Sequence, residues 1–111
     1  MLSPTNENLR DAIEIAKHYG LESRMDILQE ECAELIQAVS KLRRATAAGL
    51  STADRREDYL RARNDVAEEM ADVQILLLEM YHLMNNAPML EFQMNFKLKR
   101  TLSEIEGEVE E

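Results

Sequence analysis

The sequence predicts an all-α protein, built as a four- to five-helix bundle that is completed by oligomerisation. Its 111 residues are 45% hydrophobic, which is too apolar for a disordered chain. Only 3 Gly, 2 Pro and 2 Phe are present, which disfavours a turn-rich β architecture, whereas the abundant Ala, Leu, Glu, Met and Arg are strong helix formers. This length suits a single domain with a modest core, and small helical domains often complete their cores by associating.

Capping residues predict where the helices begin and end. Helix starts are indicated by Ser3 before Pro4, by Ser23 with Asp26 and by Ser51 with Asp54. Helix ends are indicated by Gly20, by Gly49 and by the turn at 85–88. The predicted helices cover about 4–19, 23–47, 52–85 and 88–105. The third could instead break near Asn64, which would separate 52–63 as a helix of its own.

The charge and cysteine content limit the functional classes. A net charge of −9 argues against nucleic-acid binding, because phosphate contacts need a basic face. No apolar run reaches the roughly 18 residues that span a bilayer, so we expect no membrane segment. The single cysteine, Cys32, cannot form an internal disulfide, and its place among apolar positions favours a packing role over a nucleophile. We therefore expect a cytoplasmic protein, with a frayed acidic tail at about 104–111.

Two acidic half-sites are the most informative feature of the chain. They are Glu30-Glu31-Cys32-Ala33-Glu34 and Glu68-Glu69-Met70-Ala71-Asp72. Residues three apart share one face of a helix, so Glu31 with Glu34, and Glu69 with Asp72, can each present two carboxylates to one point. Crowded carboxylates repel unless a cation lies between them, and Mg²⁺ prefers oxygen ligands.

The position of these acids on their helices supports the same hypothesis. At ~100° per residue, Glu31 falls near the edge of an apolar arc, Glu69 points into the middle of one, and Asp72 lies at its margin. A buried ionised carboxylate costs several kcal/mol unless it is paired, coordinated or protonated. A structural ion pair with Arg or Lys would explain Glu69 alone, but four acids in one pattern favour a metal site.

The pattern EExxE followed by ExxD resembles the MazG-like nucleoside triphosphate pyrophosphohydrolases, a superfamily that includes dimeric all-α dUTPases and phosphoribosyl-ATP pyrophosphohydrolases. The matching segments are EECAELIQAVSKLRR from Glu30, NDVAEEMADVQILLLEM from Asn64 and FKLKRTL from Phe96, and the resemblance covers about 10–102. The chain departs from the shortest members in the longer gap between its half-sites. The Arg-rich segment 43–63 in that gap could be a lid, an oligomer contact, a phosphate-facing patch or a solvated helical extension.

The resemblance implies a Mg²⁺-dependent hydrolase, with Mn²⁺ as a substitute, that cleaves a nucleoside triphosphate between the α and β phosphates, as in the house-cleaning of nucleotides. By similarity, Glu31, Glu34, Glu69 and Asp72 would be the catalytic metal ligands. Candidate phosphate-binding residues are Lys41, Lys97 and Arg100. Glu30 and Glu68 would lie behind the ligands, facing solvent or orienting a water. The protein is expected to form a homodimer or homotetramer and to bind a nucleoside triphosphate as its substrate.

Two other functions compete with this hypothesis. Glu79 and His82 form one Glu-x-x-His element, but a four-helix di-iron site needs that element on two helices, and His18 has Ile15 three residues before it. The other competing function is a non-catalytic helical interaction module whose acidic pairs are surface charges. His18 and Tyr19 could contact a base, although packing is the simpler role.

Overall fold

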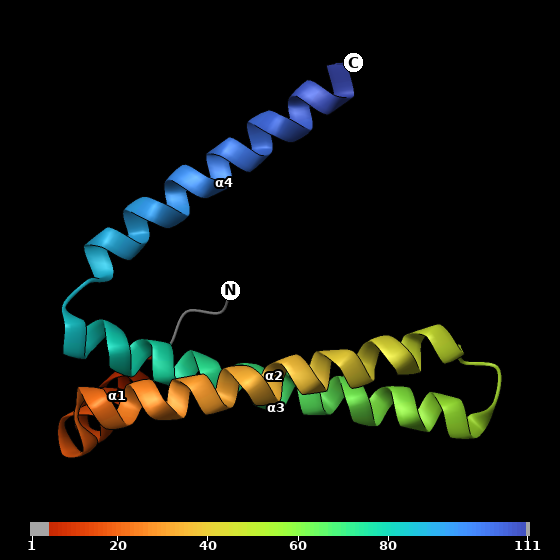
Figure 1. Cartoon of the computed structure of the whole chain (residues 1–111), viewed down its shortest axis with the longest axis horizontal. Helices are drawn as coiled ribbons and strands as arrows, with labels where there is room; N and C mark the ends of the chain where they lie inside the picture. The colour runs from red at the N-terminus through yellow and green to blue at the C-terminus, as the bar shows by residue number, and fades with distance from the viewer. Residues whose placement is uncertain (1–4, 111) are drawn as a thin grey trace.

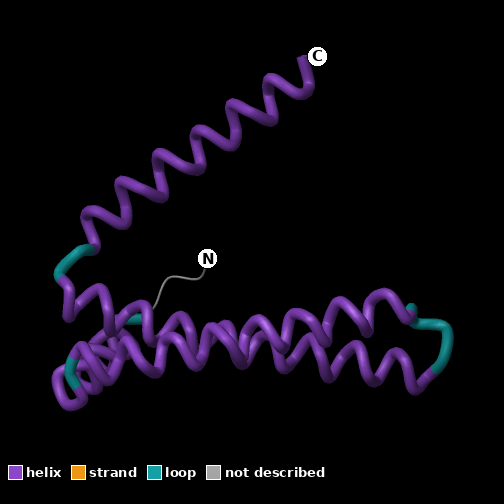
Figure 2. Tube along the Cα trace, viewed as in Figure 1, coloured by secondary structure: helices purple, strands orange, loops and turns teal. Residues whose placement is uncertain are grey.

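The structure is a computed structural model that describes residues 5–110, with side chains to Glu108, and it consists of helices joined by short loops (Figure 2). The helices are α1 (Asn6–Tyr19), α2 (Leu21–Ala48), α3 (Ala53–Met84) and α4 (Ala87–Glu110). No strand occurs within residues 5–110, so the prediction of an all-α protein is confirmed.

The two long helices α2 and α3 form an antiparallel hairpin, and α1 packs across its open end, chiefly against α3 (Figure 1). Ala12 and Ala16 of α1 are buried there, because small side chains let two helix backbones approach closely. α4 leaves the end of α3 and extends away from the other three helices (Figure 1). The molecule therefore measures 48 × 42 × 24 Å, with a radius of gyration of 18.0 Å.

The first two helices begin at other residues than the sequence predicts. Thr5 caps α1, since its hydroxyl accepts a hydrogen bond from the Asn8 backbone N–H at 3.0 Å; the predicted cap at Ser3 and Pro4 lies outside the described residues. α2 begins at Leu21 and not at Ser23, because Gly20 reverses the chain within one residue at φ 85°. Ser23 lies inside the helix, where its hydroxyl accepts from Arg24 Nη2 at 3.0 Å.

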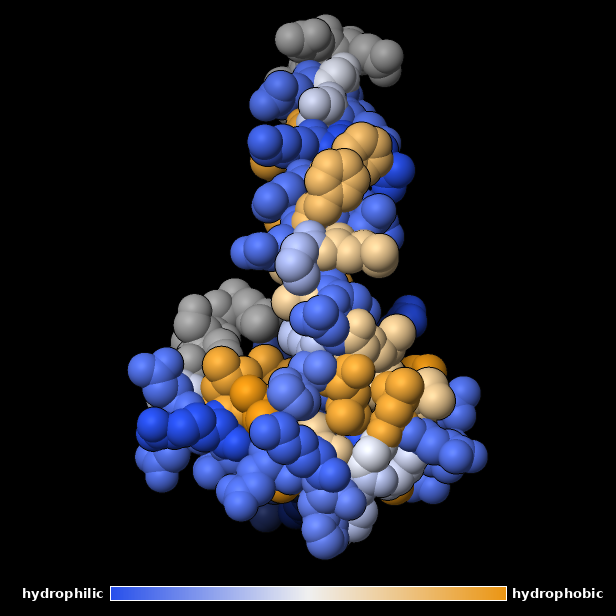
Figure 3. All heavy atoms as spheres, turned by 90° about the vertical axis from the view of Figure 1, so that its left-hand side faces the viewer, coloured by the Kyte–Doolittle hydropathy of each residue, from blue (hydrophilic) through white to orange (hydrophobic). Residues whose placement is uncertain are grey.

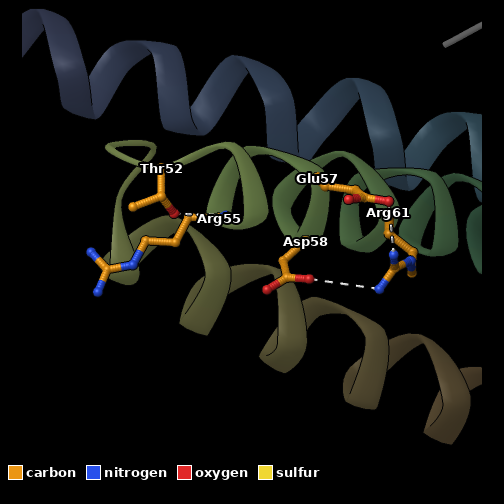
Figure 4. A network of polar contacts seen from close by, with 5 residues as sticks. All are labelled: Thr52, Arg55, Glu57, Asp58 and Arg61. Atoms are coloured by element: carbon orange, nitrogen blue, oxygen red, sulfur yellow. Dashed lines mark hydrogen bonds and ion pairs between the residues drawn. The ribbon is translucent and has the colours of Figure 1, made fainter.

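α3 is one unbroken helix through Asn64, whose side-chain amide donates to Glu68 Oε1 at 3.4 Å. Its cap is Thr52 and not Ser51, and the Thr52 hydroxyl accepts from the Arg55 backbone N–H at 3.1 Å (Figure 4). The break considered near Asn64 is therefore absent from α3.

Arginines hold the turn between α2 and α3. Arg55 Nη1 donates to the Ala48 carbonyl at 2.9 Å, and Arg56 Nη1 donates to the Leu50 carbonyl at 3.1 Å. The Arg55 bond satisfies a carbonyl that the end of α2 leaves without a helical partner, and the Arg56 bond joins the loop to α3. Further along α3, Arg61 pairs with Glu57 at 3.4 Å and Asp58 at 3.6 Å on the solvent side (Figure 4). The segment 43–63 is thus the distal end of the hairpin, where three of its arginines bind the turn or neighbouring acids.

The core is sparse, and α4 takes no part in it. The buried hydrophobic residues of the described chain are Ala12, Ala16, Ala38, Ala62 and Leu76. Every residue from 91 to 108 is exposed, and α4 continues beyond the predicted end at 105 to Glu110. Asn85 ends α3 in a left-handed conformation (φ 51°), after which the chain changes direction. Within one chain, α1, α2 and α3 therefore pack together and α4 stands apart, and the completion of the bundle by oligomerisation stays a prediction.

None of the helices in residues 5–110 has both the length and the apolar character needed to cross a membrane. Cys32 is half-buried and carries a free thiol, which agrees with the predicted absence of an internal disulfide.

Candidate metal centre

Three of the four predicted metal ligands meet at the seam between α2 and α3. Glu31 of α2 and Glu69 and Asp72 of α3 each offer one carboxylate oxygen, and these three oxygens all lie within 4.8 Å of one another. Helical periodicity accounts for the meeting, because each residue lies on or beside the face that its helix turns toward the other. We call Glu31, Glu34, Glu69 and Asp72 the acidic cluster.

Two of these carboxylates have a buried oxygen with no hydrogen-bond partner in the protein. Glu31 and Glu69 are half-buried, and the Oε2 atom of each is buried without a hydrogen-bond partner. The ion pairs found among the described side chains are Arg24–Glu79, Arg61–Glu57 and Arg61–Asp58, so none of them neutralises the acidic cluster. The structural ion pair that could have explained Glu69 is therefore not observed within residues 5–108.

Burial and the charges of neighbouring acids raise the pKa of both inner acids, Glu31 and Glu69. Burial raises the pKa of Glu31 from 4.5 to about 7, and the neighbouring charges of Glu34 and Asp72 add to the effect. Burial also raises the pKa of Glu69, with further contributions from the charges of Glu34 and Asp72. Glu34 is exposed on α2, yet it lies close enough to act on both inner carboxylates.

The geometry fits a small divalent cation. Opposite oxygens around an octahedral Mg²⁺ lie about 4.2 Å apart, so separations of up to 4.8 Å close with small side-chain movements. The donors are all carboxylate oxygens, the ligand type that Mg²⁺ and Mn²⁺ prefer. A bound cation would also give the two unsatisfied Oε2 atoms their missing partner.

The other predicted site residues lie on the surface. Lys41 is exposed on α2, two helical turns beyond Glu34. Lys97 and Arg100 are exposed on α4, and because α4 extends away, one chain does not bring them to the acidic cluster. Glu30 and Glu68 are both exposed, and Glu68 accepts the hydrogen bond from Asn64. The structure thus brings three of the four acids together within one chain, but it does not bring Lys97 and Arg100, two of the predicted phosphate-binding residues, to them.

Glu79, considered from the sequence only as half of a Glu-x-x-His element, is the most buried polar side chain of the described residues, and neither its burial nor its partner was predicted. Its side chain is 1% exposed, and its Oε1 lies 3.7 Å from Arg24 Nη1. The Arg24 guanidinium also stacks over the Tyr19 ring, 4.4 Å from its centroid. The available signal was spacing, since Arg24 precedes Glu31 by seven residues and Glu79 follows Asp72 by seven. Both therefore continue the seam that carries the acidic cluster.

His18 and Tyr19 lie at a surface hollow of about 400 Å³ on α1, which is also lined by Asp11, Glu14 and Ile15. Their rings meet edge to face at a centroid distance of 4.7 Å. Tyr19 packs on Arg24, so the packing role considered for it is present in the structure.

Comparison with family models, with curated proteins and with solved structures gave no match to this chain. A function for this chain is therefore inferred from its acidic cluster and from the resemblance of its two acidic half-sites.

Proposed function

We propose that this chain is a Mg²⁺-dependent nucleoside triphosphate pyrophosphohydrolase. The observation that carries the proposal is the pair of buried, unpartnered carboxylate oxygens on Glu31 and Glu69, which face each other across two helices with Asp72 beside them. An arrangement that only served stability would pair these acids with Arg or Lys, as the chain does for Glu79. The resemblance of the two acidic half-sites to the MazG-like enzymes supplies the reaction.

In this reaction a water molecule adds to phosphorus and the α–β phosphoanhydride bond breaks, so that a nucleoside monophosphate, pyrophosphate and a proton are formed. Glu31, Glu34, Glu69 and Asp72 would hold Mg²⁺, which supplies charge neutralisation at the phosphates. House-cleaning of nucleotides is the role that we propose for this activity.

The test is a pyrophosphate-coupled assay of purified protein with Mg²⁺ across common and modified nucleotides. We expect pyrophosphate, and we expect Glu69→Gln and Asp72→Asn each to lower the rate by at least about 100-fold while the helical circular dichroism is kept. Asp26→Asn is the matched control, since Asp26 is exposed on α2 and lies outside the acidic cluster. Orthophosphate as the sole product would overturn the assignment of the bond, and full activity in both variants would remove these acids from the site.

The second candidate is a non-catalytic helical oligomerisation module, which the exposed apolar side chains of α4 favour. A passive module would show little change in melting temperature on addition of Mg²⁺. A metal-binding enzyme must be stabilised, because the ion binds the native state more tightly than the unfolded chain.

A further inference from the structure

Arg24 connects the first three helices at the open end of the hairpin. It belongs to α2, its Nη1 lies 3.7 Å from Oε1 of Glu79 on α3, and its guanidinium stacks on the ring of Tyr19, the last residue of α1. Figure 3 views this end of the hairpin, where apolar side chains form a band below the start of α4. The Arg24 side chain is 12% exposed and that of Glu79 is 1% exposed, so bulk water does little to screen the ion pair.

The acidic cluster lies between two connections of α2 to α3. At the distal end of the hairpin, Arg55 of α3 donates to the Ala48 carbonyl of α2 at 2.9 Å. At the open end, the connection is the Arg24–Glu79 ion pair. At 1.5 Å per residue, Glu31 is about 10 Å along α2 from Arg24 and about 26 Å from Ala48. The ion pair is therefore the nearer of the two connections to the acidic cluster.

Few apolar side chains are fully buried along this seam. The buried hydrophobic residues of α2 and α3 are Ala38, Ala62 and Leu76, and the two alanines each bury only a methyl group. The carboxylates of the acidic cluster lie close enough for their charges to raise the pKa values of the inner acids. Without a cation, the repulsion between these carboxylates therefore pushes α2 and α3 apart, and the ion pair opposes that separation.

Besides neutralising Glu79, the ion pair specifies one register of α2 against α3. Apolar side chains of similar volume often stabilise a protein as well as a buried ion pair does. Here the pair makes one contact, and Nε of Arg24 and Oε2 of Glu79 are buried without hydrogen-bond partners. Sliding α2 along α3 by one turn would bury each charge alone, whereas half-buried neighbours such as Leu28, Leu35 and Leu77 fit one another in more than one register.

We propose that the Arg24–Glu79 ion pair is a clamp, which holds α2 and α3 at the spacing and register that keep the metal-free acidic cluster assembled. Arg24 and Glu79 are thus positioning residues, which act through Glu31 and Asp72 and lie two turns away from them. The clamp raises the affinity for Mg²⁺, because a site that is reassembled on binding loses part of its binding energy. The effect on Mg²⁺ rests on the proposed function, whereas the effect on the metal-free protein does not.

The first test is the affinity for Mg²⁺, measured by isothermal titration calorimetry. The double variant Arg24→Met with Glu79→Leu removes the ion pair and leaves neither charge buried. We expect its Mg²⁺ dissociation constant to increase about 10-fold while its helical circular dichroism is kept. Arg24→Lys keeps the cation, and its dissociation constant should stay within about 3-fold of that of the natural chain. Arg61→Met is the matched control, because it removes an exposed ion pair of the same hairpin, and it should leave the affinity unchanged.

The second test follows the thiol of Cys32, which is half-buried beside Glu31 and reports on the seam without metal. In the metal-free double variant, we expect a thiol reagent to label Cys32 at least about 5-fold faster than in the natural chain, because separated helices expose the thiol. The two chains have the same net charge, so the rate reports access to the thiol. In the natural chain, removal of Mg²⁺ should change the rate by less than about 2-fold, because the clamp already holds the helices together.

The outcomes separate the clamp from the proposed function. Natural affinity for Mg²⁺ in the folded double variant, or labelling of its Cys32 at the natural rate, would overturn the clamp. Strongly accelerated labelling of the natural chain on removal of Mg²⁺ would also overturn it, because the cation and not the ion pair would then close the seam. If the natural chain binds no Mg²⁺, the proposed function fails, and faster labelling of the metal-free double variant would still establish the clamp. If the double variant loses its helical circular dichroism, Glu79→Gln, which keeps the shape of the side chain, takes its place with the same expectations.

Discussion

Arg24 of α2 and Glu79 of α3 form a buried ion pair, with Nη1 and Oε1 3.7 Å apart. The pair lies two helical turns from the acidic cluster on both helices, since seven residues separate Arg24 from Glu31 and Asp72 from Glu79. Along the seam between α2 and α3, Glu79 therefore has a cationic partner, whereas the acidic cluster two turns away has none among the described side chains. Because α2 and α3 are antiparallel, the register that sets Arg24 against Glu79 also sets Glu31 against Asp72.

Replacement of Arg24 by Met should destabilise the protein by about 3 kcal/mol, because it leaves the carboxylate of Glu79 buried and unpaired. Burial already raises the pKa of Glu79, and Arg24 opposes that rise. The double variant Arg24→Met with Glu79→Leu should recover much of the loss, since no charge is then buried. Urea unfolding followed by circular dichroism measures the free energy of unfolding of both variants. A decrease of less than about 0.5 kcal/mol for Arg24→Met would show that the ion pair contributes little to stability.

Removal of one charge from the acidic cluster should have opposite effects with and without metal. In metal-free buffer, Glu69→Gln should raise the melting temperature, because it relieves repulsion from Glu34 and Asp72 and no longer buries a charge. With Mg²⁺ present, the same variant should lack the stabilisation that the natural chain gains. Differential scanning calorimetry in chelator and in Mg²⁺ gives both values. A destabilised metal-free variant would indicate that Glu69 makes a favourable contact.

The stability of the metal-free protein should depend on pH through Glu31. Its pKa is about 7 in the folded protein and near 4.5 in the unfolded chain, so the folded state holds more protons between these values. The free energy of unfolding should therefore decrease as the pH rises from 4.5 through about 7. Glu69, whose pKa is also raised, contributes in the same direction.

Mg²⁺ competes with those protons, so its stabilising effect should grow over the same pH interval. Urea unfolding at several pH values, with and without Mg²⁺, measures both trends. Glu31→Gln is the control and should flatten the dependence. A metal-free stability that rises between pH 4.5 and 7 in the natural chain would contradict the assignment.

The sequence predicts the features that are determined within a single helix better than those that depend on contacts between helices. Helix content and the half-buried positions of Glu31 and Glu69 follow from apolar periodicity, which a single helix determines. The approach of Glu31 to Glu69 and Asp72 depends on how α2 lies against α3, and it was expected from the shared pattern of the two acidic half-sites and from the family resemblance. The pairing of Glu79 with Arg24 was not predicted, because it depends on the register between two helices. The position of α4 was also not predicted, since nothing in the pattern of one helix says which surface will cover it.

At the start of α3, Ser51 and Thr52 are alternative N-cap residues. The sequence favours Ser51 with Asp54, whereas the structure has the Thr52 hydroxyl accepting from the Arg55 backbone N–H at 3.1 Å. Thr52→Ala should therefore cost about 1 kcal/mol, and Ser51→Ala much less, since Ser51 accepts only an exposed bond of 3.3 Å from Arg55 Nη1. Thr52 lies about 25 Å along α3 from Glu69, so both variants should keep the response to Mg²⁺. Urea unfolding separates the two positions, and a greater loss for Ser51→Ala would assign the cap to Ser51.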